Sequence, residues 1–65
     1  MLKESQIKQI LQTLKQDDTG FRYSTTDRDI QEKLYDVSPY VVGFKREIRG
    51  FYCQGLSDLG KSLLD

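Results

Sequence analysis

The sequence predicts a small, mostly α domain of four helices with at most a two-stranded β-ribbon. Apolar residues recur at helical spacing in four stretches, capping residues precede two of them, and two short aromatic segments alternate as strands do. With 65 residues, the chain is expected to form a single domain over residues 1–65. A domain of this size buries only about 60% of its unfolded surface, so a partner subunit would add stability.

The first predicted helix covers residues 5–16, "SQIKQILQTLKQ". Its single apolar stripe consists of Ile7, Ile10, Leu11 and Leu14. Gly20 follows in a polar segment and can adopt the left-handed conformation that ends helices. The aromatic stretch "FRYS", residues 21–24, then predicts one brief strand.

The second predicted helix covers residues 26–35, within "STTDRDIQEKLYD". Hydroxyl and acidic residues open this segment, and both types suit the free N–H groups and the dipole at a helix start. Ile30 and Leu34 lie one turn apart and supply its inner face. A tight turn containing Val37 is expected to follow.

The third predicted helix covers residues 38–49. Ser38 is placed to cap it, and Pro39 falls at the first helical position, where its missing N–H costs nothing. The expected buried stripe consists of Val37, Val41, Phe44 and Ile48. Gly50 then ends the helix. The surface opposite the buried stripe is expected to be exposed and available to a ligand.

A second strand and a last helix complete the chain. In "FYCQ", residues 51–54, Phe51 and Cys53 share one face and Tyr52 lies on the other. This strand is expected to pair with "FRYS", and Cys53 to be buried as a small apolar side chain. The last helix has Ser57 as its cap. Its apolar stripe consists of Leu56, Leu59 and Leu63.

The composition argues against an enzyme, a metal site and a membrane protein. The chain has no histidine and one cysteine, which excludes a Cys/His zinc site and removes the commonest general base. No glycine-rich phosphate motif is present, so we expect no cofactor. No apolar run approaches the roughly 20 residues of a membrane span, and the N-terminus lacks the pattern of a secretory signal. We therefore expect a cytoplasmic location.

The charge pattern points to one local surface. Ten basic and ten acidic residues cancel, which argues against a general polyanion binder. Within residues 37–50, however, Lys45, Arg46 and Arg49 outnumber Glu47. Basic residues near a helix C-terminus are also what the helix dipole favours, so this cluster alone does not decide between a binding surface and a solvated helix end.

The order of the predicted elements resembles a small winged-helix or helix-turn-helix domain. The stretch "DIQEKLYDVSPYVVGFKREI" is similar to the helix-turn-helix unit of bacterial and phage regulators. Its matching positions are Ile30, Leu34, Val37, Ser38, and Val41 or Val42. It departs from that pattern at Gln31 and at Tyr35-Asp36, where a small residue and a turn glycine are expected. The turn is therefore expected to be one residue longer.

A longer resemblance covers residues 6–51, which look similar to the C-terminal DNA-binding domain of nitrogen-type alternative sigma factors. The matching positions are Tyr23, Ser24, Asp27, Ile30, Leu34, Val42, Arg46 and Glu47. Pro39-Tyr40 replaces the basic box of that family, so its promoter readout is not carried over. The ending "GLSDLGKSLLD" resembles the helix after the wing in winged-helix regulators.

These resemblances imply a sequence-specific DNA-binding protein, a small transcriptional or recombination regulator of bacterial or phage type. Helix 38–49 would enter the major groove of double-stranded DNA, with Arg46 reading guanine, and two copies would occupy adjacent half-sites as a homodimer. The predicted DNA-binding residues are Ser38, Pro39, Tyr40, Val42, Gly43, Lys45, Arg46, Arg49, Arg28 and Arg22.

The sequence leaves a second function open. The same scaffold could be a protein-binding module without DNA contact, acting as an accessory regulator or inhibitor of a transcription protein. Zero net charge favours it, as does an outer surface of Tyr40, Val42 and Gly43 rimmed by basic residues, which is typical of a protein-interface hot spot.

Overall fold

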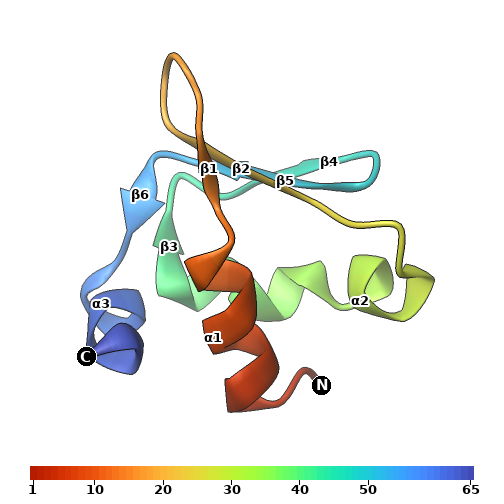
Figure 1. The fold of residues 1–65 in the computed structure, drawn as a ribbon, viewed down its shortest axis with the longest axis horizontal. Coiled ribbons are helices and arrows are strands. Elements are labelled where there is room, and N and C mark those ends of the chain that lie inside the picture. Colours follow the sequence, from red (N-terminus) through yellow and green to blue (C-terminus); the bar gives the residue numbers. More distant parts are fainter.

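A four-stranded antiparallel sheet forms one layer of the structure, and the helices form the other (Figure 1). The computed structural model describes residues 1–65. The sheet has the order β1-β2-β5-β4. Its strands are β1 (Lys15–Gln16), β2 (Phe21–Ser24), β5 (Gly50–Cys53) and β4 (Lys45–Glu47). A second, two-stranded sheet pairs β3 (Val41–Val42) with β6 (Gly55–Leu56).

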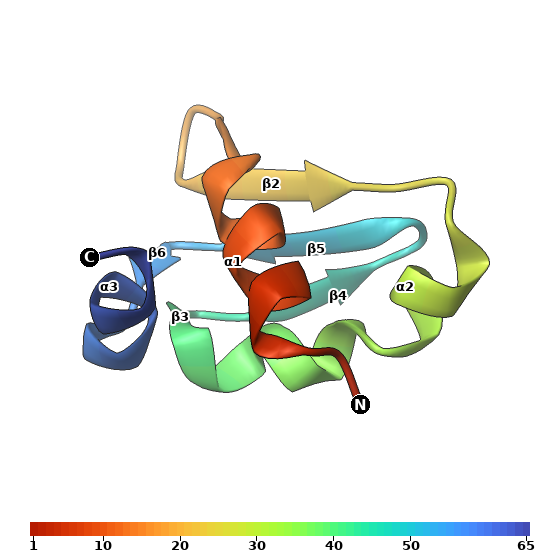
Figure 2. The same cartoon turned by 60° about the horizontal axis from the view of Figure 1, so that its bottom comes forward.

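The helical layer covers one face of the four-stranded sheet (Figures 1 and 2). Its elements are α1 (Glu4–Gln12), α2 (Arg28–Glu32), the 3₁₀ helix η1 (Leu34–Tyr40) and α3 (Asp58–Leu64). The chain is 43% helix and 26% strand, so it is an α+β domain. The prediction of a mostly α, winged-helix-like domain with at most a two-stranded ribbon is therefore wrong. None of the helices combines the length and the apolar character that crossing a membrane would require.

The predicted helix 38–49 does not exist. Ser38 and Pro39 lie in the last turn of η1, which ends at Tyr40, and the chain then continues as β3, a turn, and β4. Gly43 has a φ of 71°, a left-handed conformation that interrupts a right-handed helix and that glycine adopts easily. Two consecutive valines precede it and favour extended backbone. Ile48, predicted to be buried, is 92% exposed in the turn between β4 and β5.

The predicted second helix is divided into two elements. Asp27 caps α2 through its carboxylate, which accepts hydrogen bonds from the N–H groups of Asp29 (2.9 Å) and Ile30 (3.4 Å). The chain then tightens into η1, and the buried side chains of Leu34 and Val37 point into the core. The inner face of this region was thus predicted correctly, whereas the helix-turn-helix geometry was not.

The other predicted helices and strands are present, but the predicted stripe of the last helix is wrong, because Leu56 lies in β6 and Leu59 is 51% exposed. Helix α1 buries most of its predicted stripe, although it ends at Gln12 because residues 15–16 pair with β2. Strands β2 and β5 pair as expected, with Tyr23 opposite Phe51. Ser57 caps α3, and its hydroxyl accepts a hydrogen bond from the Gly60 N–H at 3.2 Å.

The core lies between the inner face of the sheet and the helices. Its nine buried residues are Leu2, Ile7, Ile10, Leu11, Leu34, Val37, Val41, Phe51 and Cys53. Phe51 is fully buried at its centre and packs against the rings of Tyr23 and Phe44, with centroid separations of 5.6 Å and 5.2 Å. All apolar packing is therefore concentrated on one side of the sheet, and the other side is left to polar side chains.

Arg46 joins the two layers near the β4–β5 turn. Its guanidinium donates hydrogen bonds to the carbonyl oxygens of Gln31 (2.7 Å) and Gly50 (2.7 Å), and also to that of Glu47. We call this set of bonds the Arg46 clamp. It holds α2 against the β4–β5 hairpin, because an arginine can donate several hydrogen bonds from one planar group.

Candidate nucleic-acid interface

The face of the four-stranded sheet that points away from the helices carries charged and aromatic side chains. Alternation along β2 turns Phe21 and Tyr23 toward the core and exposes Arg22 and Ser24. Along β5 the same alternation leaves Tyr52 partly exposed between buried neighbours. No helix covers this open face (Figure 1).

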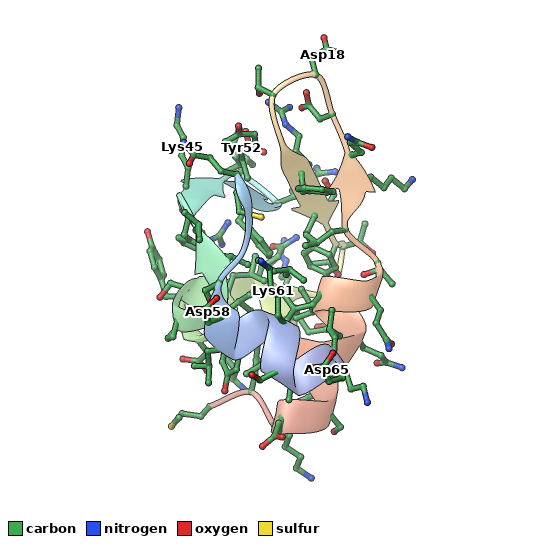
Figure 3. The ribbon with its side chains drawn as sticks, turned by 90° about the vertical axis from the view of Figure 1, so that its left-hand side faces the viewer. Asp18, Lys45, Tyr52, Asp58, Lys61 and Asp65 are labelled. Atoms are coloured by element: carbon green, nitrogen blue, oxygen red, sulfur yellow. The ribbon has the colours of Figure 1, made fainter.

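Four outward side chains line up across the strands. Lys15 pairs with Arg22, Arg22 pairs with Tyr52, and Tyr52 pairs with Lys45. We call Lys15, Arg22, Tyr52 and Lys45 the basic row. With neighbouring strands about 4.8 Å apart, the row extends over about 14 Å. Figure 3 shows two of its members, Lys45 and Tyr52, close together on the side away from α3.

Tyr52 is held in place at the centre of the basic row. Its hydroxyl donates a hydrogen bond to the Thr19 carbonyl oxygen at 2.7 Å. The Arg22 guanidinium lies over its ring, 5.8 Å from the centroid. Gly20 makes room for this arrangement, because a Cβ atom there would be only 2.8 Å from the Tyr52 hydroxyl oxygen. The ring is thus ordered before any ligand arrives.

Two carboxylates reduce the charge of the basic row. Arg22 Nε lies 2.8 Å from an Asp17 carboxylate oxygen, and Arg22 Nη2 lies 3.7 Å from one of Glu47. The three basic groups of the row and these two acids sum to a charge of +1. The two lysines form no ion pair within 4.0 Å, so they are free to meet an anion.

A hollow lies beside the β4–β5 turn. It has a volume of about 340 Å³ and is lined by Thr26, Arg28, Gln31, Ile48 and Arg49. We call it the arginine hollow. A second hollow adjoins it, sharing Thr26 and Arg49 and adding Ser24 and Thr25. Ser24 is the last residue of β2, so this second hollow lies next to the open face of the sheet.

The structure divides the ten predicted DNA-binding residues into separate places. Arg22 and Lys45 belong to the basic row. Arg28 and Arg49 meet in the arginine hollow. Arg46, predicted to read guanine, lies partly buried in the clamp.

The other five predicted residues lie outside both groups. Ser38, Pro39 and Tyr40 end η1, where carbonyl groups of Pro39 and Tyr40 accept hydrogen bonds from Ser57. Val42 is half-exposed in β3, and Gly43 occupies the turn that follows. These residues do not form one surface with the basic side chains, as they would have done on a helix.

The sequence-based prediction missed Lys15, Thr26 and the central position of Tyr52. Lys15 was assigned to the end of a helix and is instead a strand residue. The position of Tyr52 could have been predicted, because the expected pairing of the two aromatic strands places it beside Arg22 on the outward face. Thr26 carried no signal of its own, since its role depends on how the chain turns into α2.

Cys53 takes no part in either group. It is fully buried, and this burial raises the pKa of its thiol, an effect opposed by a hydrogen bond with the Gly55 backbone. The thiol therefore stays protonated near neutral pH and packs as an apolar side chain, as predicted.

Comparison with known proteins leaves these surfaces to be interpreted by their chemistry alone. No protein-family model, no curated protein and no solved structure matches this chain.

Proposed function

We propose that the protein binds single-stranded nucleic acid across the open face of its four-stranded sheet. One observation carries this proposal: Lys15, Arg22, Tyr52 and Lys45 lie in register across the four strands. Proteins that bind single strands combine basic side chains, which contact phosphates, with aromatic side chains, on which bases stack. A regulatory role in transcription or recombination is compatible with such binding.

The dimensions of the sheet favour a single strand over a duplex. The outer strands of the sheet are about 14 Å apart before side chains are added. The major groove of DNA is about 12 Å wide and admits a helix or a two-stranded ribbon. A flexible single strand can instead lie across a flat face and expose its bases to Tyr52. A helix over 38–49 that could read an operator is absent from the fold.

The electrostatics support modest affinity. The whole chain has no net charge, and Arg22 shares its charge with two acids. At most three phosphates can be neutralised by the basic row. The logarithm of the binding constant should therefore fall by about two for each tenfold rise in salt, since each phosphate contact on a single strand contributes about 0.7 to this slope.

Fluorescence anisotropy with labelled oligonucleotides of about 12 nucleotides tests this proposal at low salt. Single-stranded DNA, single-stranded RNA and a duplex are compared. We expect Lys45→Gln to weaken single-strand binding, and the matched variant Lys61→Gln, on α3, to leave it unchanged. Both substitutions remove one charge from an exposed lysine, and Figure 3 shows that Lys61 lies away from Lys45.

Three results would contradict the proposal. The first is the absence of single-strand binding at low salt. The second is an equal loss of affinity in the two lysine variants, which would mean that only overall charge matters. The third is tighter binding to the duplex than to either single strand.

A protein-binding role is the second candidate. It is favoured by Ile48, an apolar side chain that is 92% exposed at a hairpin tip, and by Val42, which is 48% exposed. A module of this class would retain a protein partner, lose it on Ile48→Ser, and show no salt-sensitive binding of oligonucleotides. Tyr40 is less useful as a test position, because its side chain is partly buried and packs against the core, so its substitution would also affect stability.

A further inference from the structure

We propose that the arginine hollow is a phosphate-binding site, and that it receives a phosphate of the single strand that crosses the open face. The source of the phosphate rests on the proposed function. The affinity of the hollow for phosphate does not, because it follows from the residues that line the hollow.

The lining is rich in hydrogen-bond donors and contains no acid. Arg28 and Arg49 each carry a planar guanidinium that suits bidentate contact with phosphate, and Thr26 adds a hydroxyl group. Neither arginine forms an ion pair within 4.0 Å, in contrast to Arg22. An anion entering the hollow would therefore have no carboxylate to displace from either guanidinium.

Asp27 and Asp29 lie on either side of Arg28 in sequence, and Glu32 and Glu47 each adjoin another lining residue. The Asp27 carboxylate is occupied, because it caps α2. Asp29 is exposed to solvent, where water screens its charge. None of these four acids lines the hollow.

Backbone hydrogen bonds and the Arg46 clamp hold the walls of the hollow together. The Thr25 N–H donates to the Arg49 carbonyl oxygen at 2.9 Å, which joins the end of β2 to the hairpin. The Gln31 side-chain amide donates to the Thr25 carbonyl oxygen at 2.6 Å. Only the arginine side chains remain to be ordered on binding, which lowers its entropic cost.

The position of the hollow suits the end of a nucleic-acid strand. Ser24 follows Arg22 by two residues on the same outward face, and it lines the adjoining hollow with Arg49. A strand that contacts Arg22 therefore needs to extend only a short way to place its next phosphate near Arg49. A concave site beside a flat face favours a terminal phosphate, and an internal phosphodiester is the other source of the same chemistry.

Titration with inorganic phosphate, followed by ¹⁵N NMR at constant ionic strength, tests the site without any oligonucleotide. We expect saturable shifts of the Thr25, Thr26 and Arg49 amides and of the arginine Nε–H groups of the hollow. Arg49→Gln should remove these shifts, and Lys61→Gln should preserve them. Shifts that spread over all basic residues without saturation, or that persist in Arg49→Gln, would overturn the proposal. The exposed Arg49 side chain forms no hydrogen bond or ion pair within the protein, so circular dichroism should show an unchanged fold.

A second measurement identifies the source. Oligonucleotides with a 5′-phosphate, a 3′-phosphate or neither are compared by anisotropy. A terminal phosphate in the hollow should tighten binding about tenfold, as expected for charge-assisted hydrogen bonds, and Arg49→Gln should abolish the gain. Equal binding of all three, weakened alike by Arg49→Gln, assigns the site to an internal phosphate. Binding that is insensitive to Arg49→Gln overturns the assignment.

The two proposals fail in different ways. If inorganic phosphate binds in the hollow but no oligonucleotide binds, the proposed function is wrong and the phosphate site stands. If oligonucleotides shift only residues of the basic row and inorganic phosphate causes no saturable shifts in the hollow, the proposed function stands and the phosphate site is wrong.

Discussion

Removing the Arg46 clamp should destabilise the protein strongly. In Arg46→Met the aliphatic stem remains, while the hydrogen bonds to the carbonyl oxygens of Gln31, Glu47 and Gly50 are lost. A hydrogen bond from a charged donor contributes about 1.5–3 kcal/mol. Arg46 is partly exposed, so we take the lower value for its two bonds at 2.7 Å, which gives about 3 kcal/mol.

This loss is large for so short a chain. At roughly 0.05–0.15 kcal/mol per residue, 65 residues give a free energy of unfolding of about 3–10 kcal/mol. Urea unfolding followed by circular dichroism measures the change. With a slope of about 1 kcal/mol per molar urea, the midpoint should fall by about 3 M. Arg46→Lys should lie between the wild type and Arg46→Met, because a lysine ammonium can reach fewer carbonyls.

Lys45→Met is the matched control, since Lys45 is the preceding residue and points outward. It should change the free energy of unfolding by no more than about 0.5 kcal/mol, as exposed substitutions usually do. Equal urea midpoints for Arg46→Met and Lys45→Met would refute the structural role of Arg46. Equal midpoints would also mean that the Arg46 side chain is available to contact a ligand.

Three further predictions concern single positions. Gly50→Ala should cost more than about 2 kcal/mol in thermal unfolding, because its Cβ would collide with the Tyr23 carbonyl group, whereas Gly55→Ala should be nearly neutral since nothing lies within 4 Å. Ser57→Ala should cost about 1 kcal/mol in urea unfolding through loss of the α3 cap. Burial raises the pKa of the Cys53 thiol above its ordinary value of 9.0. The stabilisation from keeping this thiol neutral is therefore complete below pH 9 and is lost as pH rises through the folded-state pKa. The stability difference between wild type and Cys53→Val should therefore shift against the wild type above pH 9, and a constant difference would exclude this linkage.

Elements with strong local signals could be predicted from the sequence. The stripe of α1 and the cap of α3 each lie within a few consecutive residues, so each is determined by interactions between residues close in sequence. The pairing of β2 with β5 was also predictable, because alternation puts Phe51 and Cys53 on a face that must be buried. These three features account for much of the core.

The region 38–49 could not be predicted in the same way. Val37, Val41 and Phe44 have helical spacing, yet the same three side chains reach the core from a 3₁₀ helix, a short strand and a turn. Strands of two or three residues, such as β1 and β4, have no periodicity to detect. They exist because β2 and β5, distant in sequence, offer them hydrogen-bonding partners.

The candidate site was predicted residue by residue but not as an arrangement. Arg22, Lys45, Arg28 and Arg49 were all named as binding residues, on the basis of charge alone. Their division into a row and a hollow depends on strand register and on the path of the β4–β5 turn, which no local pattern contains. Arg46 was predicted to contact DNA but is bound inside the fold, because nothing in the sequence distinguishes an inward-pointing from an outward-pointing arginine.

The short outer strands of the sheet have a consequence for how copies of this protein meet. A sheet edge with unpaired N–H and C=O groups can recruit a neighbouring chain, and long flat edges do so most readily. Here β1 offers two residues and β4 three, and both begin with an exposed lysine. The edge strands therefore offer a second molecule few unpaired backbone groups with which to extend the sheet. The lysine at the start of each edge strand also places a positive charge beside them. At high concentration the protein should therefore resist edge-to-edge aggregation, and the open face should keep its four-strand width.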